Sequence, residues 1–209
     1  FVRLDSIGVE RHIAYTGYIS SRPALSKTGR IWWTEYRRSL LYEQRVNSRL
    51  CYIDIESGRA RTISRYRNIL YPTATDSDKS IAWVEYHPDG HFSIVEGNKS
   101  KRKVITSFDT NTEIHSLAWD NLTQRLYFIA TDDSGMWIGR INADATHSRI
   151  TESAYITISN LKAYDGVLYF GSIASGKDEA HCLNLTTGKQ YRISNSRYGS
   201  FSPAPTYDG

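Results

Sequence analysis

The sequence has too few cysteines for a disulfide framework and no long apolar run. Its 209 residues include only two cysteines, Cys51 and Cys182, which we expect to be buried free thiols. No stretch of 18 apolar residues occurs, so the chain offers no candidate transmembrane helix. No signal peptide is recognisable, and the sequence begins at Phe1 instead of Met. We therefore expect that a segment was removed or that the chain is a piece of a longer protein.

The motifs of common enzyme classes are also missing. A serine hydrolase needs a G-x-S-x-G elbow between a strand and a helix. The segment Gly171–Gly176 has the wrong spacing and is expected in a hairpin. No Walker or dinucleotide-binding glycine pattern is present. We expect no catalytic residue and no cofactor in this chain.

Two clusters of metal-ligand residue types are better explained as turns. His87 and His91 are spaced as in a helical zinc site, but the Pro88–Gly90 segment between them predicts a turn and no third ligand stands nearby. The pair Asp132-Asp133 is followed by Ser-Gly and lacks the alternating oxygen ligands of a calcium loop. We predict no metal site.

The composition favours exposed hairpins over disorder. Hydrophobic residues make up 40% of the chain, while aromatic residues are frequent, with 15 Tyr and 5 Trp. The net charge of +4 is modest. A protein that binds a nucleic-acid groove usually concentrates basic residues on one face, so we expect no nucleic-acid partner.

A repeated strand organises the whole chain. IWWTEY (31–36) returns as IAWVEY (81–86), and weaker copies follow as RLYFIAT (125–131) and VLYFGSI (167–173). These β-branched and aromatic runs begin near Ile31, Ile81, Leu126 and Leu168, which are 50, 45 and 42 residues apart. Runs of this kind behind turn signals indicate buried strands. A repeat period of 40 to 50 residues decides the fold.

Each buried strand is the second of four. The predicted first strands with their turns are 21–29, 71–79, 115–124 and 160–166, the third strands are 49–55, 91–97, 136–142 and 180–185, and the fourth strands are 60–64, 102–107, 147–153 and 190–196. Glycine or asparagine in most of the short turns between third and fourth strands suits tight hairpins. The repeating unit is therefore a four-stranded antiparallel meander.

These units predict an all-β fold, a β-propeller of four complete blades plus partial blades at both ends. A blade cannot cover both of its faces alone, so it stacks on its neighbours. A β-sandwich is the alternative, but sandwiches do not repeat at a constant period. Over 1–209 the repeats are 1–15 (partial), 21–64, 70–107, 115–153, 159–196 and 200–209 (partial). Because a closed propeller hides every sheet edge, we expect a fragment of a larger ring.

The order of strands and turns resembles the TolB-type repeat of β-propellers. The residues that carry the resemblance are 26–29 with Ile31-Trp32-Trp33, Asp165-Gly166 with Leu168-Tyr169-Phe170, and 202–209. Thr28 replaces the turn Asp of that pattern, and Trp119-Asp120 closes a first strand, which is not the place of the dipeptide in a WD repeat. The resemblance implies three contexts: periplasmic proteins that dock envelope partners, substrate-gating propellers of prolyl-oligopeptidase-type or tricorn-type peptidases, and segments of secreted bacterial proteins.

The segment 37–48 (RRSLLYEQRVNS) is expected to be a long loop between second and third strands. Eight arginines and three acidic residues lie between Arg37 and Arg67. A solvated basic surface is one interpretation. The other is a docking patch for an acidic partner or an anionic glycan, since Arg and Tyr are typical interface residues. RNA fits poorly because no stacking platform of aromatics accompanies the arginines.

In a propeller, the loops between second and third strands share one face with the connections between repeats, and loops on a rigid scaffold commonly carry binding sites. The candidate partner-binding residues on this loop face are Arg37, Arg38, Tyr42, Arg67, His87, Asp132 and Lys177. Asp89, Asp133, Asp178, Tyr66, Asn68, Asp109, Asn111 and Tyr155 are expected on the same face.

Two functional hypotheses remain open. The chain is either a non-catalytic module that binds a protein, peptide or glycan, or the gating propeller of a larger serine peptidase whose catalytic residues lie elsewhere. A propeller enzyme that acts alone is disfavoured, because no paired carboxylates or metal cluster can be assigned. From the resemblance alone we expect an extracytoplasmic location, in the periplasm or on the surface of a bacterium, and further propeller blades or domains in a longer parent protein.

Overall fold

The computed structural model describes residues 1–4, 8–38, 46–63, 68–76, 80–98 and 100–205. These residues form strands and turns only, so they contain no helix that could serve as a membrane span. The chain divides into two compact units, one of 1–86 with 95–103 and the other of 87–94 with 104–209. Each unit is described by itself.

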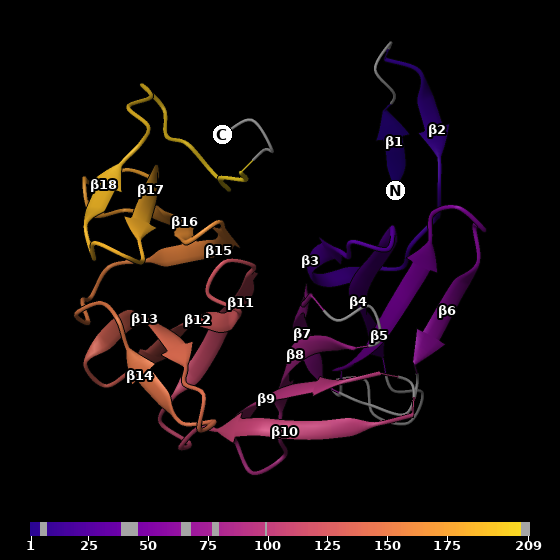
Figure 1. Ribbon diagram of the computed structural model, residues 1–209, viewed down its shortest axis with the longest axis horizontal. Helices are drawn as coiled ribbons and strands as arrows, with labels where there is room; N and C mark the ends of the chain where they lie inside the picture. The colour runs from indigo at the N-terminus through magenta and orange to yellow at the C-terminus, as the bar shows by residue number, and fades with distance from the viewer. Residues whose placement is uncertain (5–7, 39–45, 64–67, 77–79, 99, 206–209) are drawn as a thin grey trace. The chain divides into compact units, whose positions relative to one another are not determined.

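The strands pair into four-stranded antiparallel sheets in chain order (Figure 1). Sheet B comprises β3 (Ile19–Leu25), β4 (Arg30–Arg38), β5 (Val46–Asp54) and β6 (Ala60–Ile63); sheet C comprises β7 (Ile69–Ala74), β8 (Ile81–Tyr86), β9 (Phe92–Gly97) and β10 (Arg102–Ser107). Sheet D comprises β11 (Glu113–Asp120), β12 (Arg125–Asp132), β13 (Gly135–Ile141) and β14 (His147–Arg149); sheet E comprises β15 (Ile158–Tyr164), β16 (Val167–Ser172), β17 (Glu179–Asn184) and β18 (Gln190–Arg192). Near the N-terminus, β1 (Val2–Leu4) pairs with β2 (Glu10–His12). The all-β propeller architecture with four complete blades is thus confirmed.

The prediction of a loop over 37–48 is wrong at both ends of that segment. Strand β4 continues through Arg37 and Arg38, which pair with Asn47 and Val46 of β5. The segment contains no glycine or proline, so nothing interrupts the hydrogen-bond ladder between these two strands. The middle of the segment, 39–45, lies outside the described residues.

Every first strand carries an irregularity in its pairing with the second strand. Register shifts occur in β3, β7, β11 and β15. In β7 the shift surrounds Tyr71, which has φ of 50° and precedes Pro72. Because proline has no N–H to donate to the hydrogen-bond ladder, it is confined to sheet edges and bulges. The first strand is an edge strand with a bulge, so it accommodates the proline.

The C-terminal segment keeps this bulge signature without forming the expected first strand. Ser202 has φ of 60° and precedes Pro203, as Tyr71 precedes Pro72. No strand is formed over 200–205, and 206–209 lie outside the described residues. The physical reason is pairing: the described residues include no second strand that could accept hydrogen bonds from this segment.

The predicted aromatic face of the second strands is buried as expected. Trp33, Trp83, Phe128 and Phe170 are at most 3% exposed. Their alternate neighbours Trp32, Ala82 and Tyr127 are also buried, while Tyr169 and Ile31 are half-buried. A strand that is apolar on both faces must be covered on both faces.

In both units, blades cover one another in the same way. In the first unit, Trp32 of sheet B packs in one cluster with Trp83 and Ile81 of sheet C. In the second unit, Tyr127 of sheet D packs with Phe170 of sheet E. The intervening residue of one second strand thus shares a buried cluster with the aromatic residue of the next second strand, and this cluster joins the two blades of each unit.

Both cysteines are free and lie in third strands. Cys51 in β5 is buried as predicted, whereas Cys182 in β17 is only half-buried. Burial raises the pKa of both thiols, so we expect both to react slowly with alkylating reagents at neutral pH.

We predict that Trp83→Ala lowers the free energy of unfolding by about 3–5 kcal/mol, because the indole is fully buried between sheets B and C. The control is Tyr191→Ala, which removes an aromatic that is 52% exposed on β18 and should cost under about 0.5 kcal/mol. Urea melts of both variants provide the measurement. A larger loss for Tyr191→Ala would contradict the blade packing described above. Tyr42, the exposed aromatic that the sequence suggested, lies outside the described residues.

Candidate binding surface

The candidate residues lie at the ends of second strands and in the turns that follow them, as far as they are described. Tyr42 and Arg67 lie outside the described residues, and so does Tyr66. Arg37 and Arg38 are the last residues of β4. The remaining candidates, His87, Asp132 and Lys177, belong to the second unit, where their surroundings can be followed in detail.

His87 begins the turn between β8 and β9. Its ring stacks on the His91 ring at a centroid distance of 4.0 Å, and its backbone N–H donates to the His91 carbonyl. An Asp89 carboxylate oxygen lies 2.6 Å from His91 Nδ1. Stacked rings cannot aim two nitrogens at one ion, and no set of three potential metal ligands is found in the described part of the chain. The predicted turn is confirmed.

Asp132 ends β12 and acts as the centre of a polar clamp. Its carboxylate accepts hydrogen bonds from Ser134, from Trp137 Nε1 at 2.9 Å and from Arg149. Desolvation by burial raises the pKa of Asp132, but the hydrogen bonds and the Arg149 charge outweigh it, so the pKa lies below its ordinary value. Both oxygens are therefore committed to partners inside the blade.

Lys177 lies in the turn between β16 and β17. Its ammonium group contacts Glu179 Oε1 at 3.0 Å and donates to the Ser196 carbonyl. Ser200 N–H donates to the Asp178 carbonyl at 2.8 Å. The turn between second and third strands is thereby tied to the segment that follows the fourth strand.

In sheet D as well, the turn between the second and third strands contacts the segment that follows the fourth strand. Tyr155 Oη donates to the Asp133 carbonyl, and Met136 pairs with Ala154 through a β-bridge. The shared loop face inferred from propeller geometry is therefore formed within sheets D and E of the second unit. Most of the charged candidate residues on this face form hydrogen bonds or ion pairs within their own blade.

Sequence reasoning missed a repeated clamp in the second strands of sheets B and C. Trp33 Nε1 donates to Glu35 at 2.8 Å, and Arg49 donates to the same carboxylate at 2.9 Å. In sheet C, Trp83 Nε1 donates to Glu85 at 2.9 Å, and Arg102 replaces Arg49. The signal was visible as W-x-E at the same place in IWWTEY and IAWVEY. Each buried acid joins residues of a single sheet, which is a structural role.

The aromatic residues that face solvent follow a clear pattern. Among the large hydrophobic residues of the described chain, five are at least 70% exposed: Tyr15, Tyr18, Tyr155, Tyr198 and Phe201. Tyr15 and Tyr18 lie between β2 and β3, Tyr155 lies between β14 and β15, and Tyr198 and Phe201 lie on the segment that follows β18. Of these, only Tyr155 was among the residues expected on the loop face. Exposed aromatics that gather on one type of loop are typical of binding surfaces.

The sequence matches no protein-family profile, and no curated protein matches it. Solved structures match at the level of fold. TolB from Acinetobacter baumannii has a TM-score of 0.70 and 16% identity, over 92% of this chain and 48% of TolB. A putative TolB from Agrobacterium tumefaciens has a TM-score of 0.72 and 15% identity, over 96% of this chain and 71% of that protein.

A third structure shows that the same fold occurs in an enzyme. A puromycin-hydrolysing peptidase of Mycobacterium tuberculosis has a TM-score of 0.64 and 14% identity, over 88% of this chain and 30% of the peptidase. The chain thus has the fold of the TolB-type β-propellers. It spans about half the length of the Acinetobacter TolB.

We predict that the clamp around Glu35 makes stability depend on pH. Burial raises the pKa of Glu35, but hydrogen bonds from Trp33, Arg49 and Gly17 outweigh it, so the pKa lies below its ordinary value. A carboxyl with a lowered pKa in the folded state stabilises the fold above the unfolded pKa of about 4.3, and this contribution is lost as pH falls through the folded pKa. Glu35→Gln should therefore flatten the fall in the free energy of unfolding between about pH 5 and pH 3.

Urea melts at several pH values provide the measurement for this prediction. The matched control is Glu56→Gln, which removes the same charge from an exposed turn after β5. If the free energy of unfolding of Glu35→Gln falls with decreasing pH as steeply as that of the unmodified chain, this clamp does not couple folding to proton binding.

Proposed function

We propose that the chain is a non-catalytic TolB-like propeller module that binds a protein, peptide or glycan partner through its loop face. The observation that carries the proposal is the placement of the most exposed aromatic side chains on the segments that follow the outermost strand of a sheet. Burying such rings against a partner yields much contact area at little cost in side-chain entropy.

Within the proposed surface of the second unit, we assign different roles to the charged candidates and to the exposed tyrosines. Asp132 and Lys177 are held by partners in their own blades, so their proposed role is to shape the loops. Tyr155 and Tyr198 are 86% and 83% exposed, and the Arg197 guanidinium lies 5.3 Å from the centre of the Tyr198 ring. We assign the contacts to these tyrosines and to Arg197, since Tyr and Arg are enriched among residues that dominate binding energy.

The alternative is the gating propeller of a larger serine peptidase. The likeness to the puromycin-hydrolysing peptidase favours it. The sequence of the parent gene beyond Gly209 would distinguish between the two proposed functions. An α/β-hydrolase nucleophile elbow there supports the gating role, and a stop after two or three more repeats supports the binding module. In both cases we propose an extracytoplasmic location, which rests on the resemblance to TolB-type repeats. Hydrolase activity of the isolated chain on a broad substrate panel would overturn the non-catalytic assignment.

The binding role predicts a specific effect of the loop tyrosines. The purified chain is probed with a displayed library of random dodecapeptides and with a glycan array, and the selected ligands are titrated against variants. Tyr155→Ser combined with Tyr198→Ser should weaken binding by about tenfold or more, as expected for aromatic anchors. Tyr191→Ser removes an exposed tyrosine from β18 and should leave affinity within about twofold. Ligands that bind all variants equally, or no selected ligand at all, would contradict the proposal.

A further inference from the structure

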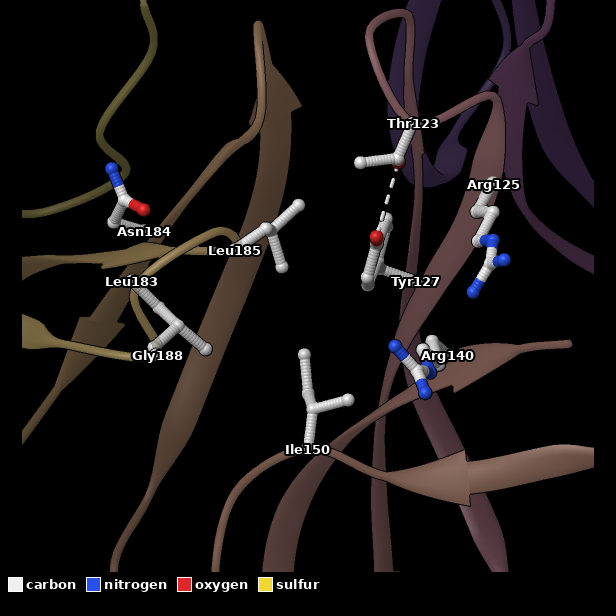
Figure 2. Close-up of a pocket in the computed structure, with 9 residues that line it drawn as sticks. All are labelled: Thr123, Arg125, Tyr127, Arg140, Ile150, Leu183, Asn184, Leu185 and Gly188. Carbon is white, nitrogen blue, oxygen red and sulfur yellow. Dashed lines mark hydrogen bonds between the residues drawn. The ribbon is translucent and has the colours of Figure 1, made fainter.

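A cleft of about 340 Å³ opens between sheets D and E, away from the loop face. Figure 2 shows that its two walls differ in chemistry. Arg125, Tyr127 and Arg140 come from sheet D and form a polar wall, while Leu183 and Leu185 come from sheet E and form an apolar wall. Ile150 closes the cleft on one side. The volume lies at the lower end of the range for small-molecule sites.

Strand geometry places two like charges on the polar wall. Arg125 and Tyr127 are two residues apart on β12 and therefore share a face. Arg140 pairs directly with Tyr127 across β12 and β13, so the two arginines are diagonal neighbours on one sheet surface. Like charges at such positions disfavour the folded state unless a negative charge lies between or beside them.

No carboxylate of the described chain forms an ion pair with these two arginines. Neither Arg125 nor Arg140 forms an ion pair with a described residue, and Arg140 makes only a 3.3 Å hydrogen bond from Nε to Ser148. Asp120 pairs with Arg125 in the strand register, but its oxygens accept from Thr123 and from Gly166 N–H. The terminal nitrogens of both guanidinium groups are therefore available to a ligand.

The uncharged polar groups on the sheet D wall hydrogen-bond to one another and to Asp120, and Asn184 Oδ1 on the other wall accepts from Thr186 and Thr187 N–H. Thr123 Oγ1 donates its only proton to Asp120, so at 3.1 Å from Tyr127 Oη it accepts the tyrosine proton. Tyr127 is 2% exposed and is fixed in place by this chain of hydrogen bonds. The charged donors left to bind a ligand are thus the two guanidinium groups, which prefer planar anions.

We propose that this cleft binds a carboxylate that is carried on an apolar body. The carboxylate would lie against Arg125 and Arg140, and the body would cover Leu183, Leu185 and Ile150. A bulky, highly charged phosphate ester would satisfy the arginines but leave the leucine wall in water. Two sources share the required chemistry: a small organic acid, and the C-terminus of a peptide that ends in an apolar residue. The site is separate from the loop face proposed above.

The test uses probes that differ only in charge. Calorimetric titration of the complete chain with 4-phenylbutyrate and with the neutral 4-phenylbutanol compares an acid with its uncharged counterpart. The peptide arm compares N-acetyl-Gly-Gly-Leu with a free C-terminus and its C-terminal amide. We expect at least one acid to bind about tenfold or more tightly than its neutral partner, since hydrogen bonds to charged groups are the stronger class. Binding of the small acid identifies the first source, and binding of the peptide acid alone identifies the second.

Variants separate a ligand site from a structural role. Arg125→Gln and Arg140→Gln should each abolish the preference for the acid. Because they relieve like-charge repulsion, they should leave Tm in the absence of the acid unchanged or raised. Arg59→Gln, in the exposed turn before β6, is the matched control and should keep the preference. Equal binding of acids and neutral partners, absence of binding up to about 10 mM, or an acid preference that survives both substitutions would overturn the proposal.

Discussion

The contact between the second strands of neighbouring blades is the interaction on which the rest of the structure depends. Each second strand is apolar on both faces, so a blade in isolation would expose one aromatic face to water. Trp32 with Trp83 and Tyr127 with Phe170 cover these faces in pairs. Removing large aromatic area from water is the dominant favourable term at this scale. Within each unit, the packing of one blade against the other therefore stabilises both.

This constraint explains why the proposed binding features occupy two different kinds of place. The buried second strands leave no room for chemistry within a blade, so solvent-facing function is restricted to the strand ends and to the grooves between blades. The strand ends carry the exposed tyrosines. The groove between sheets D and E borders the apolar cluster that contains Tyr127 and Leu183, two residues that also line the groove. Loop face and cleft are consequences of one packing geometry.

The sequence predicted most of the fold and little of the site. The second strands were recognisable because aromatic and β-branched residues had to be buried on both faces. The fourth strand predicted over 102–107 is confirmed, but two others were predicted too long: the strand predicted over 147–153 ends at Arg149, and that predicted over 190–196 ends at Arg192. These outer strands pack against little, so their pattern carries no strong signal. The loop tyrosines were mostly missed because exposure depends on tertiary packing, and the cleft was missed because its walls come from two blades.

The different layouts of the acidic clamps bear on how the repeats avoid mispairing. In sheets B and C the indole and the carboxylate stand two residues apart on one strand. In sheet D they come from different strands, Trp137 on β13 and Asp132 on β12. Sheet E instead buries Glu179 of β17 beside Ser194 and Lys177. A strand exchanged between blades would bury a carboxylate without its donors, which is costly. These differences distinguish sheets D and E from sheets B and C. The similar strands at 31–36 and 81–86 share one layout but take their arginine from different strands, Arg49 from β5 and Arg102 from β10, so an exchanged strand would meet its arginine at the wrong place.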